Sequence, residues 1–101
     1  MDRILSIVND VIDIAGRGCV LFPGIPIGAP YTAKVRDPIR LVRPDKSILE
    51  TYISGIEIFR GAVAGPFPIL MPREIQKSDI PIGTTVVLAE TSLPIIPPSA
   101  H

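Results

Sequence analysis

Residues 46–60 read KSILETYISGIEIFR and are rich in β-branched and aromatic side chains. Such residues favour a pleated, half-buried strand. Bulky apolar groups occur at both even- and odd-numbered positions, so both faces of this strand are expected to be covered. The stretch therefore predicts a long strand that crosses the middle of a sheet. Gly55, which has no Cβ, would allow it to bulge midway.

The segments around this stretch predict further short strands. Residues 39–43 are expected to pair with the long strand as a hairpin, because 44–46, PDK, forms a turn. Residues 4–14, ILSIVNDVIDI, also fit the spacing of an amphipathic helix. A strand is favoured there because the segment is rich in β-branched residues and the turn AGRG follows at 15–18. Other strands are predicted at 19–22, 66–71 and 84–88.

Two segments carry finer predictions. The prolines in 66–71, PFPILM, place that strand at a sheet edge, because proline cannot donate to a ladder. Residues 74–79, EIQKSD, are polar and could form one helical turn, with Ile75 and Ile80 pointing inward. Cys19, the single cysteine, is interpreted as a small buried strand residue rather than a catalytic one.

Six or seven short strands separated by turns predict an all-β fold, a small closed antiparallel barrel. Closure would remove the exposed edges that so apolar a chain could not otherwise tolerate. The twelve prolines and eight glycines are scattered between apolar runs, and they indicate turns between the strands. The barrel is expected to be one domain over residues 1–91, with 92–101 a proline-rich, flexible tail.

The composition excludes several function classes. Ten basic residues balance ten acidic ones, which gives no general attraction to nucleic acid or anionic membranes. The basic run from 34 to 46 is interpreted mainly as a solvated face, because stacking aromatics are scarce there.

The one histidine is His101, so neither a metal site of nitrogen and sulfur ligands nor a Ser-His-Asp arrangement is expected. No cofactor motif and no membrane span is predicted, and the chain is expected to be cytoplasmic.

The order of four sequence blocks resembles the second, β-barrel domain of elongation factor Tu and related translational GTPases. The blocks are 10–20 (DVIDIAGRGCV), 34–42 (KVRDPIRLV), 55–60 (GIEIFR) and 75–87 (IQKSDIPIGTTVV). The resemblance covers roughly residues 7–89 and implies a closed six-stranded antiparallel barrel. It implies no GTP binding by this chain, because a P-loop needs a Gly-Lys pair and the sequence has none.

In this family the barrel helps to hold the acceptor end of aminoacyl-tRNA, and its outer surface meets the ribosome. The resemblance places the hairpin tip at Gly16, Arg17 and Gly18. Arg36 stands where the family's K-V-G-D turn has glycine, and 70–73 read LMPR where the family has L-L-R-G. The candidate residues for contact with a partner or RNA are Gly16, Arg17, Gly18, Arg36, Arg40 and Arg73.

Two functions follow as hypotheses. The first is a non-catalytic interaction module that binds a protein partner or itself, with 25–30 and 66–71 as contact faces. The alternative is a module that binds RNA or the end of tRNA in translation, with the arginines above and Lys34 on phosphates. An enzyme is the least favoured reading, and DNA is not an expected partner.

Overall fold

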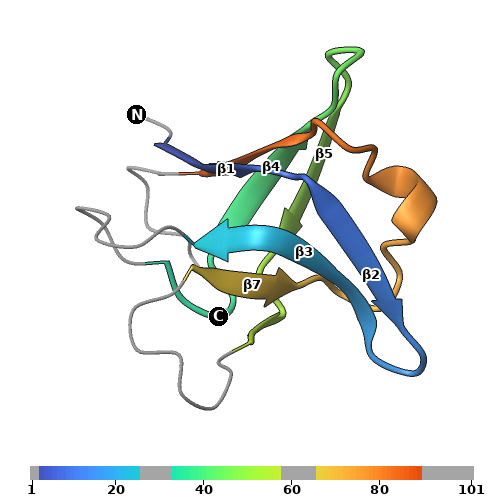
Figure 1. The fold of residues 1–101 in the computed structure, drawn as a ribbon. Helices are drawn as coiled ribbons and strands as arrows, with labels where there is room; N and C mark the ends of the chain where they lie inside the picture. The colour runs from blue at the N-terminus through green and yellow to red at the C-terminus, as the bar shows by residue number, and fades with distance from the viewer. Residues whose placement is uncertain (1–2, 26–32, 58–65, 90–101) are drawn as a thin grey trace, which may run out of the picture.

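The computed structural model describes residues 3–25, 33–57 and 66–89. These residues form an all-β structure of eight strands and one short 3-10 turn (Figure 1). The strands are β1 (Arg3–Ile7), β2 (Asp10–Ile14), β3 (Gly18–Ile25), β4 (Pro38–Val42), β5 (Ile48–Tyr52), β6 (Gly55–Ile56), β7 (Phe67–Leu70) and β8 (Thr85–Leu88), with η1 (Lys77–Asp79) before β8.

The strands form two antiparallel four-stranded sheets. Sheet A has the order β1-β8-β4-β5, and sheet B has the order β2-β3-β7-β6. The predicted all-β class is confirmed, and so are the predicted hairpins, seen as β2–β3 and β4–β5. No ladder within the described residues joins the two sheets into a closed barrel, so the predicted closure is not confirmed.

Two of the predicted strands are each divided in two. Residues 4–14 become β1 in sheet A and β2 in sheet B, and 46–60 become β5 and β6 in the same way. The helical alternative for 4–14 is therefore wrong. The break between β5 and β6 falls at Ile53 and Ser54, just before the glycine where a bulge was expected.

The prediction that the long strand crosses the middle of a sheet is wrong, because β5 and β6 are edge strands. The cause is a change of backbone partner at the break. The N–H of Arg36 donates to the Ile53 carbonyl at 2.7 Å, and the Ile53 N–H donates to the Asp37 carbonyl at 3.0 Å. The next N–H, of Ser54, donates to the Leu70 carbonyl of sheet B at 2.9 Å. The side of the strand that faces the core changes at this crossing. This change explains why apolar residues occur at both even- and odd-numbered positions of the stretch.

The hydrophobic core lies between the sheets and includes both crossing points. Leu41 and Val86 of sheet A face Leu21 and Ile69 of sheet B, and all four are fully buried. Ile53, at the crossing between β5 and β6, is fully buried as well. Each crossing segment therefore anchors two sheets at once.

The prediction that 66–71 forms an edge strand is wrong. β7 lies inside sheet B, between β3 and β6. Its register with β3 is irregular between Leu21 and Ile25, so Pro68 faces a stretch where no regular ladder bond is required of it. A Cβ on Gly24 would stand 2.0 Å from the Phe67 carbonyl oxygen, so only glycine lets the two backbones approach this closely.

Other predictions are confirmed or fall outside the described residues. The helical turn is present as η1, and Ile75 and Ile80 flank it as buried residues. Cys19 is buried in β3. The tail at 92–101, the end of the opening stretch at 58–60 and most of the predicted contact segment 25–30 are not among the described residues.

Candidate functional site

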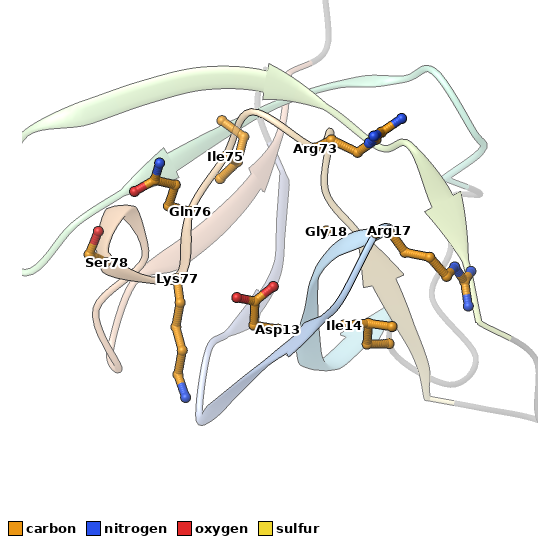
Figure 2. Close-up of a pocket in the computed structure, with 10 residues that line it drawn as sticks. Asp13, Ile14, Arg17, Gly18, Arg73, Ile75, Gln76, Lys77 and Ser78 are labelled. Atoms are coloured by element: carbon orange, nitrogen blue, oxygen red, sulfur yellow. The ribbon is translucent and has the colours of Figure 1, made fainter.

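A groove of about 530 Å³ lies between the tip of the β2–β3 hairpin and the segment that leads into η1 (Figure 2). We call it the tip groove. It brings together four of the six candidate residues, which are Gly16, Arg17, Gly18 and Arg73. The other lining residues are Asp13, Ile14, Ile75, Gln76, Lys77 and Ser78.

The hairpin tip that walls the groove is fixed by its backbone. The N–H of Arg17 donates to the Ile14 carbonyl at 2.9 Å, which closes the turn. Gly18 has a φ of +125°, and a Cβ there would lie 2.8 Å from the Met71 carbonyl oxygen. Gly16 also has positive φ but faces open space. The motif Gly-Arg-Gly is thus explained by turn geometry at both glycines and by a close backbone approach at one.

The charges of the tip groove are mixed. Arg17 and Arg73 lie on one side of it and Lys77 on the other, with Asp13 between them (Figure 2). The Arg17 guanidinium forms an ion pair with Glu57 at 2.9 Å. An anionic group entering the groove would therefore meet two exposed cations, Arg73 and Lys77, and one carboxylate.

A short set of hydrogen bonds positions Lys77 and Ser78. The Gln76 N–H donates to the Asp79 carboxylate at 2.9 Å, which closes the turn locally. The Nε of Arg43 donates to the Asp79 carbonyl at 2.8 Å, which ties η1 to the end of β4. Sequence reasoning missed Lys77 as a groove residue, although its place in the predicted helical turn after Arg73 was the available signal.

Cys19 lies next to Ile75, one of the residues that line the tip groove, and its thiolate is disfavoured. The Cys19 thiol, next to the buried Ile75, contacts the Ile75 carbonyl at 3.6 Å. Burial raises the pKa of this thiol, and the carboxylates of Asp13 and Asp79 raise it further. A raised thiol pKa disfavours the thiolate that nucleophilic chemistry needs.

The remaining candidates, Arg36 and Arg40, lie away from the tip groove. The basic run of 34–46 is divided by β4, with Lys34 and Arg36 before the strand and the β4–β5 turn after it. Arg40 points outward from the strand itself and lies 3.5 Å from Glu50 of β5. The structure therefore does not assemble the six candidates into one patch.

Tyr52 lines two smaller hollows. One, of about 210 Å³, also involves Pro38, Arg40 and Ala89. The other, of about 120 Å³, involves Arg36 and the crossing point after β5. Stacking aromatic residues were expected to be scarce near the basic run, but Tyr52 is 41% exposed. Tyr52 is more than ten residues from Arg36 and Arg40 in the sequence. The sequence therefore did not indicate that an aromatic side chain shares a hollow with each arginine.

The outward side of sheet A is apolar over most of its width. Antiparallel sheets with one solvated face usually place polar side chains there. The strand registers instead align Ile7, Thr85, Val42 and Ile48 in one row and Ile4, Val87, Arg40 and Glu50 in the next, so that apolar side chains predominate. We call this surface the outer face; it consists of Ile4, Ile7, Pro38, Arg40, Val42, Ile48, Glu50, Tyr52, Thr85 and Val87.

A bulge in β1 contributes two of the largest exposed groups to the outer face. Ile4 pairs with Val87 and Ile7 pairs with Thr85, so three steps along β1 correspond to two along β8. Both isoleucines therefore point outward, and they are 61% and 59% exposed. Strict alternation from the sequence would have placed them on opposite faces.

Among residues 3–25, 33–57 and 66–89, no three histidine, cysteine or acidic side chains gather where they could hold a metal ion. The same residues contain no helix of the length and apolarity needed to cross a membrane. No model of a known protein family matches the chain, and no solved structure matches it.

Proposed function

We propose that the chain is a non-catalytic interaction module that binds a protein partner, or a second copy of itself, through the outer face. The observation that carries this proposal is the exposure of Ile4, Ile7 and Ile48 on one side of sheet A, each more than half exposed. The two contact faces expected from the sequence are less suitable where the structure describes them, because Ile25 is buried and so are three of the six residues in 66–71.

The fold does not require these apolar groups. The core is formed by the opposite side of the same strands, from residues such as Leu41 and Val86. Clustered apolar side chains that the core does not use are characteristic of binding surfaces. The Arg40–Glu50 pair on the outer face adds the polar element that usually gives such a surface its specificity.

We also propose that the module is cytoplasmic. This and its non-catalytic character rest on the sequence and on Cys19. The single cysteine is a free thiol, and its raised pKa argues against a nucleophilic role. The single histidine is the last residue of the sequence. A chain with one free buried thiol and no disulfide suits a reducing compartment.

The resemblance to the barrel of elongation factor Tu is part of the same proposal. Its support is the path of the chain at the sheet edges. β1 continues into β2 on one side, and β5 continues into β6 on the other, so the two sheets share both outer segments. Six segments counted around this circuit would correspond to the six strands of the family barrel.

The test is site-specific photo-crosslinking in cells with p-benzoylphenylalanine at position 7 or 48. Position 82 is the matched control, because Ile82 is 60% exposed but lies in a turn outside the outer face. We expect one discrete adduct from both outer-face positions and its loss when Ile4→Asp is added. No adduct, or the same adducts from position 82, would contradict the proposal.

The tip groove favours a second candidate function, binding of RNA in translation. Its support is the approach of Arg73 and Lys77, with Arg17 nearby, around one groove. Binding of labelled bulk tRNA should weaken steeply with salt. Arg73→Ala with Lys77→Ala should reduce the log–log salt slope by about 1.5, at roughly 0.7–0.9 per lost cation. Arg36→Ala with Arg40→Ala removes the same charge elsewhere and should leave the slope unchanged.

A further inference from the structure

We propose that Tyr52 and Arg36 form a recognition site for an extended, acidic peptide segment of a partner protein. This inference rests on the proposed function, because Tyr52 belongs to the outer face. It adds the chemistry of the partner, which is one apolar side chain and one carboxylate in the two hollows that Tyr52 lines.

The two hollows beside Tyr52 have the size for single side chains. The larger one, of about 210 Å³, is lined by Pro38, Tyr52 and Ala89 together with Arg40 and Glu50, and its apolar part would contact an apolar side chain. The smaller one, of about 120 Å³, is lined by Val35, Arg36 and Ser54. Side chains two residues apart in an extended peptide lie roughly 7 Å apart on one side of the backbone. A segment laid across the ring would thus place alternate side chains in the two hollows.

Arg36 is held in a conformation that favours glycine. Its φ is +83°, in the left-handed region that a side chain makes costly. Its N–H donates to the Ile53 carbonyl at 2.7 Å, and the Asp37 N–H donates to Lys34 at 3.0 Å. These hydrogen bonds fix the backbone of the turn with a positive φ at position 36. Glycine would adopt this φ without strain, so the strain arises because the residue is arginine. Strained backbone of this kind gathers at sites of function.

The charge of Arg36 is available to a ligand. The residue is exposed, and within the described residues its guanidinium has no ion pair or hydrogen bond. A guanidinium binds a carboxylate through two parallel hydrogen bonds. The site therefore complements an acidic side chain.

A peptide suits this site better than RNA. Glu50, whose side chain is 75% exposed, lies beside Arg40 at the larger hollow. A nucleic acid would carry a phosphate past this carboxylate at every nucleotide, whereas the proposed peptide needs only one carboxylate, at Arg36 in the other hollow. The neighbouring Pro38 is apolar and exposed, as contact with a peptide requires and contact with a nucleic acid backbone does not.

The test is selection from a phage-displayed library of random peptides against the full chain. We expect enriched peptides to share an aspartate or glutamate close to an apolar residue. Affinity of a synthetic enriched peptide should fall about tenfold with Arg36→Gly and with Tyr52→Ser. Arg36→Glu should reverse the preference towards basic peptides. Failure to enrich any peptide over an unrelated β-protein would overturn the inference.

Lys46→Gly is the matched control. Lys46 is exposed and also has positive φ, +77°, but it lies in the turn before β5, at the opposite end of the strand from Tyr52. Both glycine variants should unfold at a higher denaturant concentration than the parent chain, and only Arg36→Gly should lose peptide affinity.

The other outcomes separate this inference from the proposed function. Peptide binding unchanged by Arg36→Gly, with crosslinking at position 7 retained, would overturn the inference and leave the proposed function standing. Loss of both the crosslinks and the peptide binding would overturn both. If a single-stranded oligonucleotide competes with the peptide and its binding depends on Arg36, the peptide inference is overturned and RNA becomes the proposed ligand of the site.

Discussion

The tip groove and the outer face differ in what holds their residues in place. In the groove, Gly18 has no room for a side chain beside Met71, and Arg17 is paired with Glu57. On the outer face, Ile4 and Ile7 are more than half exposed.

This contrast separates residues that folding explains from residues that it does not. The Gly-Arg-Gly tip is accounted for by turn geometry and a close backbone approach, so its sequence alone says little about binding. The exposed isoleucines have no comparable structural task, since polar residues would satisfy a solvated strand face equally well. Their apolar character is therefore the stronger indication of function.

The largest test of the contrast compares the two sides of sheet A. Leu41→Ala removes a fully buried side chain and should lower the free energy of unfolding by about 3 kcal/mol. Ile48→Ala, on the adjacent strand but facing outward, should change it by less than about 0.5 kcal/mol. Urea denaturation followed by circular dichroism measures both values. A large loss with Ile48→Ala would show that the outer face serves stability.

The second test concerns the backbone of the tip groove. Gly18→Ala should cost about 3 kcal/mol, because the new Cβ meets a backbone oxygen at 2.8 Å and φ is left-handed. Gly16→Ala, with positive φ but open space around it, should cost about 1 kcal/mol. Equal losses in the same denaturation experiment would contradict the close approach to Met71.

A smaller effect is expected for the ion pair at the groove wall. Arg17 and Glu57 have side chains that are 53% and 21% exposed, so solvent screens their attraction. A double-mutant cycle with Arg17→Ala and Glu57→Ala should give a coupling energy below about 1 kcal/mol, falling with added salt. A larger, salt-insensitive coupling would mean that the pair is a structural clamp.

The smallest expected effect is a pH dependence of stability that comes from Cys19, next to the groove residue Ile75. Burial raises the pKa of Cys19 in the folded state. Its contribution to stability is therefore complete below the unfolded thiol pKa of about 8.5 and is lost as pH rises through the higher folded pKa. Denaturant midpoints at neutral and alkaline pH should differ more in the parent chain than in Cys19→Ala. An equal pH dependence of the two chains would count against this assignment.

The hairpin tip shows which part of the candidate site could be predicted from the local sequence. The turn at 15–18 and the buried Cys19 after it were predictable, because glycines and β-branched runs act through neighbouring residues. Lys77 and Tyr52 were missed as surface residues near the arginines. Lys77 meets Arg17 only because the β2–β3 hairpin and η1 line the same groove, and Tyr52 comes near Arg40 through the exact register of the β4–β5 hairpin. The edge position predicted for 66–71 was wrong for the same reason, since proline content does not reveal an irregular partner strand.

The sequence by itself determined that the chain forms short antiparallel strands and where most of them turn, because strand propensity and turn chemistry are local. Tertiary structure alone decided that 4–14 and 46–60 each pass from one sheet to the other. It also decided that the β1 bulge turns Ile4 and Ile7 to the same side. A side chain's face depends on register with a partner strand distant in sequence, and one extra residue in a ladder reverses it.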